Sequence, residues 1–111
     1  MPRSKRTLIS RGDVWDATIP GVGTHSVVVV TRDTALPLLS AVVCVLVTST
    51  FHGHVAEVGL GSDDGLDREC AANCDNVFTL PKKVFTRRRG RLGPTRLAQL
   101  DQALIIALGL E

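Results

Sequence analysis

Two kinds of side chain in this sequence could do chemistry at neutral pH: the imidazole of histidine and the hydroxyl of threonine and serine. His25 stands just before an apolar run at residues 27–31, and Thr48 and Ser49 directly follow a second apolar run at residues 41–47. An imidazole can accept or donate a proton, and a hydroxyl can donate a hydrogen bond to a phosphate oxygen. His25 and Thr48 are therefore candidates for a catalytic centre. The plainer interpretation stays open, because histidines near core strands are often surface residues and threonine is common in strands.

The two apolar runs are the elements that would position these candidates. Residues 41–47 are apolar and mostly β-branched, which predicts a strand buried on both faces. Residues 27–31 have the same character. If the two strands pair in one small sheet, His25 and Thr48 meet at its rim.

Two further pairs of residues could bind a metal ion. His52 and His54 would point the same way from a strand, but no third ligand is evident nearby in the sequence. Cys70 and Cys74 are spaced C-x3-C without a second pair of matching ligands, and Cys44 is typical of a small buried residue. We therefore predict no metal site and no cofactor.

The charge of the chain is uneven, although the formal net charge is only +2. Four cations lie in residues 3–11 and seven in residues 82–96, whereas acidic residues gather in residues 63–69. Such runs are usually solvated loops, but they could also form a basic surface for phosphate groups. Both interpretations stay open on charge alone.

The chain of 111 residues is long enough for one domain with a modest core. We expect a basic, flexible tail at residues 1–10 and a folded domain at residues 11–111. No apolar run approaches the roughly 20 residues of a membrane span, and no apolar signal core follows the charged N-terminus. These features predict a cytoplasmic protein.

The order of the elements predicts a mainly β (α+β) fold. Short strand patterns fill the first three quarters of the chain, and residues 83–92 are expected to form a basic turn. Leucines then recur at helical spacing after Pro94, which suits a first helical position, and Gly109 suits a helix end. The pattern indicates a small antiparallel barrel capped by a C-terminal helix.

An ordered set of short motifs carries a family resemblance. The motifs are Arg11-Gly12-Asp13-Val14-Trp15, Leu46-Val47-Thr48-Ser49, Gly65-Leu66-Asp67-Arg68-Glu69 with Cys74-Asp75-Asn76, and the tail from Leu100 to Leu110. In this order and spacing the chain resembles the MazF/PemK family of toxin endoribonucleases. The resemblance runs from Arg11 to Leu110.

The resemblance implies an SH3-like barrel, a homodimer and metal-independent cleavage of single-stranded RNA at short sequences. The reaction would be attack of the ribose 2′-hydroxyl on the adjacent phosphate, and a MazE-like antitoxin would inhibit it. Thr48 matches the threonine that the family uses in its active site.

The main departure from the family is at His25-Ser26, where most members have Arg-Pro. We expect His25 to replace the arginine as general acid or base, with Arg11 or Arg32 restoring the lost positive charge. The resemblance further implies that Asp75 and Asn76 line a base pocket and that Ser49 also binds RNA. A last group would hold the RNA backbone: Arg87, Arg88 and Arg89.

Three other functions stay open at this point. The chain could be a toxin of the same barrel type that inhibits DNA gyrase, a member that binds antitoxin or RNA without cutting, or a structural dimer. Cleavage of RNA in the presence of EDTA separates the enzyme from all three.

Overall fold

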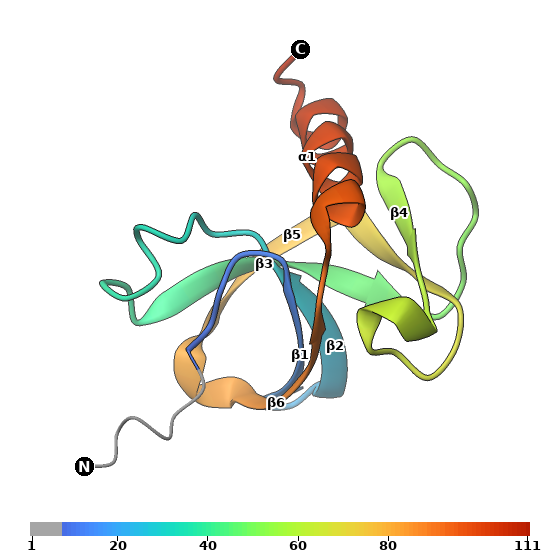
Figure 1. Cartoon of the computed structure of the whole chain (residues 1–111). Coiled ribbons are helices and arrows are strands. Elements are labelled where there is room, and N and C mark those ends of the chain that lie inside the picture. The colour runs from blue at the N-terminus through green and yellow to red at the C-terminus, as the bar shows by residue number, and fades with distance from the viewer. Residues whose placement is uncertain (1–7) are drawn as a thin grey trace.

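The computed structural model describes residues 8–111, which form a curled six-stranded antiparallel sheet and one C-terminal α-helix (Figure 1). In the sheet the strands lie in the order β4-β5-β3-β2-β1-β6. This confirms the predicted mainly β fold with a small antiparallel barrel and a C-terminal helix. The elements are β1 (Asp13–Ile19), β2 (Gly23–Val29), β3 (Ala41–Thr48), β4 (Glu57–Leu60), the 3-10 helix η2 (Ser62–Asp64), β5 (Cys70–Pro81), the 3-10 helix η3 (Lys82–Val84), β6 (Phe85–Arg91) and α1 (Pro94–Leu108).

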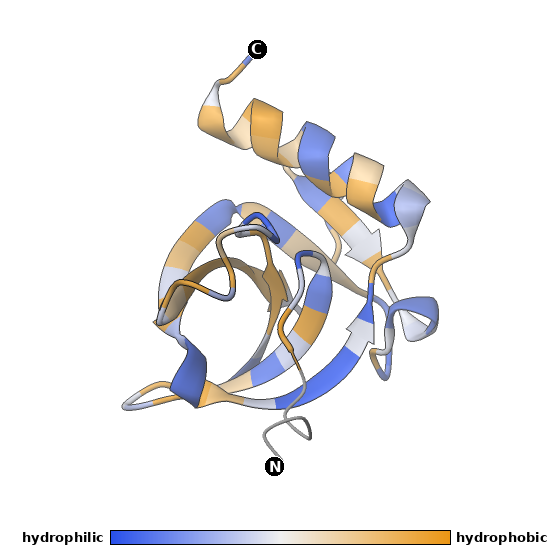
Figure 2. Cartoon of the chain, turned by 60° about the vertical axis from the view of Figure 1, so that its left-hand side comes forward, coloured by the Kyte–Doolittle hydropathy of each residue, from blue (hydrophilic) through white to orange (hydrophobic). Residues whose placement is uncertain are grey.

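Apolar residues lie on both faces of the curled sheet and divide the core into two clusters. Alternate residues of β3 enter different clusters: Val42 and Cys44 pack beside Trp15, whereas Val45 packs beside Leu100 of α1. Figure 2 shows hydrophobic and hydrophilic bands along the strands of the curled sheet. Because β3 is covered on both sides, its sequence reads as a continuous apolar run.

The helix α1 covers the cluster that contains Val45 and packs against β4 and β5. Leu100 and Ala103 are its buried residues. Gly109 ends the helix in the left-handed conformation at φ 67°, and the Leu110 N–H donates to the Ile105 carbonyl over 2.8 Å. The predicted start and end of this helix are confirmed.

The structure corrects the prediction for residues 83–92. They are not a basic turn, because Phe85–Arg91 forms β6 and pairs with β1. A long-range charge contact also links the two strands: Asp13 on β1 is fully buried and accepts a hydrogen bond from Arg91 over 3.0 Å. A buried carboxylate needs such a partner, and the sequence pattern does not reveal it.

Of the tail expected at residues 1–10, the structure describes only residues 8–10. Residues 1–7 lie outside the described part of the chain. Ile9 packs beside the cluster of Trp15, and the Ser10 N–H donates to Asp13 Oδ2 over 2.9 Å. Residues 9 and 10 therefore contact the fold.

No helix in residues 8–111 combines the length and apolar character needed to cross a membrane.

Candidate active site

His25 and Thr48 lie where β2 and β3 separate. The two strands pair from Val29 with Cys44 to Val27 with Leu46. If this register is continued by two residues beyond the pair of Val27 and Leu46, His25 lies opposite Thr48. Both residues, together with Ser49, line an open pocket of about 460 Å³, here called the His25–Thr48 pocket. The structure thus brings the candidates together, and their catalytic roles stay a prediction.

The Thr48 hydroxyl is held only by long contacts. Its Oγ1 lies 3.3 Å from the Thr50 carbonyl and 3.5 Å from the Ala71 carbonyl. Hydroxyl hydrogen bonds are usually near 2.7–2.8 Å, so these contacts hold the proton weakly. The hydroxyl is therefore free to turn toward a ligand in the pocket.

A cation enters the same pocket from β6 through an irregularity in the strand. Val14 pairs with Gly90 and Trp15 pairs with Arg88, so Arg89 is an extra residue without a partner on β1. Such a bulge redirects a side chain. Arg89 lines the His25–Thr48 pocket.

Two carboxylates hold the Arg89 guanidinium in place. Its Nη2 lies 2.9 Å from Asp67 Oδ1, and its Nη1 lies 3.2 Å from Asp16 Oδ2. The hydrogen bonds to Asp67 and Asp16 raise the pKa of Arg89. Asp16 also accepts a hydrogen bond from the Ser26 hydroxyl over 2.8 Å. The charge of Arg89 is therefore fixed at the pocket and partly neutralised there.

Two glycines allow the segment that carries Asp67 to lie on β6. A Cβ atom on Gly65 would meet the Arg89 carbonyl oxygen at 2.0 Å, and one on Gly90 would meet the Asp64 carbonyl oxygen at 2.4 Å. Gly65 also has a φ of +89°, which disfavours other residues. This close approach of backbones brings Asp67 to Arg89.

Other predicted site residues lie outside the pocket. Asp75 and Asn76 are exposed in an irregular part of β5, where its register with β3 shifts between Val45 and Leu46. Arg87 and Arg88 are exposed on β6. None of these four residues lines the His25–Thr48 pocket.

Arg11 and Arg32, one of which was expected to restore the lost positive charge, are also elsewhere. Arg11 forms an ion pair with Asp101 over 2.9 Å and donates to the Val30 carbonyl over 3.0 Å. Arg32 is exposed in the connection between β2 and β3. The cations that line the pocket are Arg68 and Arg89 instead.

Sequence reasoning did not assign Ser26, Asp67 and Arg68 to this pocket. Asp67 and Arg68 belong to a motif that carried the family resemblance, but no short-range signal connects them with His25. Only the contact of residues 64–65 with β6 brings that motif to the site.

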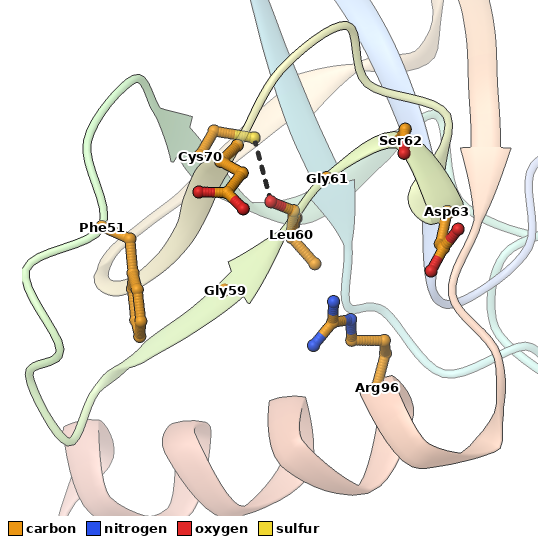
Figure 3. A pocket seen from close by; sticks show the side chains of 9 residues that line it. Phe51, Gly59, Leu60, Gly61, Ser62, Asp63, Cys70 and Arg96 are labelled. Atoms are coloured by element: carbon orange, nitrogen blue, oxygen red, sulfur yellow. Dashed lines mark hydrogen bonds between the residues drawn. The ribbon is translucent and has the colours of Figure 1, made fainter.

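A second depression, of about 320 Å³, contains none of the predicted site residues. Arg96 of α1 reaches it from one side and Phe51 lies across from it (Figure 3). Arg96 Nε lies 3.4 Å from Asp64 Oδ2, and the Asp64 side chain is only 3% exposed. Cys70 lines both this Phe51–Arg96 cavity and the His25–Thr48 pocket.

Comparison with known proteins identifies the family. The sequence profile of the PemK-like, MazF-like toxin of type II toxin–antitoxin systems matches residues 10–108. A relative from Mycobacterium tuberculosis, named probable endoribonuclease MazF2, is 40% identical over 100 residues, which cover 89% of this chain and 97% of the relative.

Solved structures agree with this match. An endoribonuclease in complex with its cognate antitoxin, from a mycobacterial species, has a TM-score of 0.83 at 28% identity and covers 93% of this chain and 97% of its own. The Mycobacterium tuberculosis toxin MazF-mt6 has a TM-score of 0.82 at 26% identity, covering 89% and 98%. The resemblance found in the sequence motifs is confirmed, and the chain belongs to the PemK-like, MazF-like toxin family of type II toxin–antitoxin systems.

Proposed function

We propose that this protein is a toxin endoribonuclease that cleaves single-stranded RNA at short sequences without a metal ion. The observation that carries the proposal is the convergence of His25, Thr48 and Arg89 in one open pocket. The relative named probable endoribonuclease MazF2 supports the same activity. Neither observation favours gyrase inhibition.

The reaction needs one phosphorus–oxygen bond to form and one to break. The ribose 2′-oxygen bonds to the adjacent phosphorus while the bond from phosphorus to the 5′-oxygen breaks, which leaves a 2′,3′-cyclic phosphate and a 5′-hydroxyl. The 2′-hydroxyl loses a proton and the leaving oxygen gains one. His25 is the imidazole of the pocket, and it exchanges a proton with these oxygens.

Negative charge grows on the non-bridging phosphate oxygens as the new bond forms, so fixed donors aimed at them accelerate the reaction. The weakly held Thr48 hydroxyl supplies one donor. Arg89 supplies positive charge, because its contact with Asp67 can be exchanged for one with a phosphate. The Asp67 side chain is 86% exposed, whereas that of Asp16 is 16% exposed and keeps the guanidinium anchored.

Residues outside the pocket would bind the rest of the RNA. Asp75 and Asn76 are exposed and can pair with base edges, and Ser49 lies at the mouth of the pocket. Arg87 is exposed and makes no ion pair within residues 8–111, so it is free to contact the phosphate backbone. Arg88 lies 4.0 Å from Asp13 and is less free. Because phosphate contacts dominate such binding, affinity should fall steeply with salt.

The toxin would work as a homodimer in the cytoplasm, and a MazE-like antitoxin would inhibit it. The support is a structural neighbour described as an endoribonuclease in complex with its cognate antitoxin. Co-expression with a MazE-like antitoxin, followed by co-purification, tests the partnership.

Cut mapping on a long RNA in the presence of EDTA tests the proposed activity. The wild type should give discrete cuts with 5′-hydroxyl ends, and His25→Ala and Thr48→Ala should both lose them. Loss of the cuts in Thr48→Ala alone would support the ribonuclease activity but show that His25 takes no part in catalysis. Absence of cuts by folded wild type would favour a member that binds without cutting.

A further inference from the structure

The connection between β3 and β4 is the green loop beside β4 in Figure 1. This loop and the first residue of β4 carry three side chains of metal-ligating types that the proposed reaction does not use. His52, His54 and Glu57 each offer one ligand atom, and these atoms all lie within 4.8 Å of one another. The sequence showed the two histidines but no third ligand, and the fold supplies Glu57. We propose that these three residues bind one divalent transition metal ion, of which Zn²⁺ is the best match.

The donor set has the chemistry of a zinc site. Two imidazoles and one carboxylate bind Zn²⁺ with bonds of about 2.0–2.2 Å, and further positions stay open for water or another ligand. Tetrahedral geometry at such bond lengths separates the ligand atoms by about 3.4 Å. Glu57 Oε2 already lies 3.4 Å from His52 Nδ1. Because all the ligand atoms lie within 4.8 Å of one another, the remaining approach is at most about 1.4 Å. The two histidines are exposed and can rotate.

The Glu57 carboxylate organises the two histidines before any ion binds. Its Oε1 accepts the backbone N–H of His52 over 2.9 Å and that of His54 over 3.1 Å. Its side chain is only 7% exposed. One oxygen therefore shapes the backbone, and the other faces the His52 ring. Outer contacts of this kind orient ligands and strengthen metal sites.

The imidazole rings are held together on the same side of the connection. The rings of His52 and His54 stack with their centroids 5.6 Å apart and their planes 26° apart. Two neighbouring imidazoles can bind the same metal ion, each through one ring nitrogen.

The ion would act on the shape of the connection rather than on the reaction. None of its three ligands lines the His25–Thr48 pocket. The ligands instead tie the residues that follow Ser49 to the first residue of β4. An ion bound there would fix Phe51, which lines the neighbouring cavity in Figure 3.

Calorimetric titration of the metal-free, full-length protein with Zn²⁺ tests the proposal. We expect one ion per chain, with affinity reduced about 100-fold in each of His52→Ala, His54→Ala and Glu57→Gln, since even the loss of an outer partner commonly costs about 10–100-fold. His25→Ala is the matched control, because it removes a histidine outside the group and should leave Zn²⁺ binding unchanged.

Co²⁺ is a second probe that reports on the ligands. Its visible absorption should appear with the wild type and without a sulfur-to-cobalt charge-transfer band, and it should be lost in His54→Ala. Circular dichroism confirms that each variant is folded. Absence of Zn²⁺ binding by the wild type, equal weakening by His25→Ala, or a cobalt–sulfur band would overturn the proposal. Because these readouts need no RNA, they are independent of the proposed ribonuclease activity.

Discussion

The His25–Thr48 pocket and the Phe51–Arg96 cavity share a wall, the segment of residues 61–70, yet they differ in how each holds its arginine. In the pocket, Arg89 binds Asp67, whose side chain is 86% exposed. In the cavity, Arg96 binds Asp64, whose side chain is 3% exposed. Asp64 also accepts the Gly61 N–H over 2.9 Å.

The difference indicates which arginine can serve a ligand. An ion pair with an exposed carboxylate is worth little and exchanges readily, whereas a buried carboxylate is costly to leave without its partner. Arg89 can therefore turn to a phosphate, and Arg96 cannot without leaving Asp64 unpaired. The pocket also has an imidazole and hydroxyls, which the cavity lacks apart from Ser62.

The largest expected effect concerns His25. His25→Ala should lower kcat for RNA cleavage about 10²–10⁴-fold, because it removes a group that transfers protons in the transition state. Single-turnover cleavage under saturating enzyme measures this separately from binding. A loss confined to KM would show that His25 binds RNA without taking part in proton transfer.

The next largest expected effect concerns the packing of Gly65, in the segment of residues 61–70, against β6. Gly65→Ala should lower the free energy of unfolding by about 3 kcal/mol, because its Cβ would meet the Arg89 carbonyl oxygen at 2.0 Å and its φ of +89° is strained. Urea denaturation measures the change. Gly61→Ala is the matched control in the same segment: its Cβ would meet no atom within 4 Å, so equal destabilisation by both variants would contradict the account.

Asp64 and Asp67 provide a paired test of the two ion pairs. Asp64→Asn should cost about 1–3 kcal/mol of stability, because a buried carboxylate loses its charged hydrogen bonds. Asp67→Asn should change stability by less than about 0.5 kcal/mol. It should instead tighten RNA binding about threefold at low salt, since it removes a charge that competes with phosphate. Fluorescence anisotropy measures the binding. A loss of stability in Asp67→Asn as large as that in Asp64→Asn would contradict the conclusion that the Arg89–Asp67 ion pair exchanges readily.

The smallest effect concerns the Cys70 thiol, which lines both depressions. Burial and then Asp64 raise its pKa above the ordinary value of 9.0, so the thiolate fraction is low at neutral pH. Asp64→Asn removes one of these causes, which lowers the pKa and should speed alkylation of Cys70. Asp67→Asn should leave the rate of Cys70 alkylation unchanged. Alkylation rates followed against pH by mass spectrometry measure this, and equal acceleration by both variants would contradict the comparison.

Much of the fold could be predicted because local patterns determined it. The β-branched residues of β3 indicated a strand covered on both sides, and Pro94 and Gly109 marked the ends of α1. The same strand patterns predicted that His25 lies near Thr48. His25 precedes one buried strand and Thr48 ends the next, and the two strands are antiparallel neighbours.

The rest of the site depends on long-range contacts. The pattern of residues 85–91 is dominated by arginines, and their pairing with β1 and the contact of Arg91 with the buried Asp13 appear only in the folded chain. Arg89 reaches the pocket because it is an extra residue in the pairing of β6 with β1. Neither strand's sequence shows this irregularity by itself. Glu57 likewise reaches His52 and His54 only after the chain folds back into β4.

The most direct test of the central claim compares Thr48→Val with Arg96→Ala in cleavage of one mapped RNA site in the presence of EDTA. We expect about a 10²–10³-fold loss of kcat for Thr48→Val, because a donor to the developing phosphate charge is removed. Arg96→Ala, measured below its unfolding temperature, should retain nearly full activity. Full activity in Thr48→Val, or a comparable loss in Arg96→Ala, would contradict the assignment of the chemistry to the His25–Thr48 pocket.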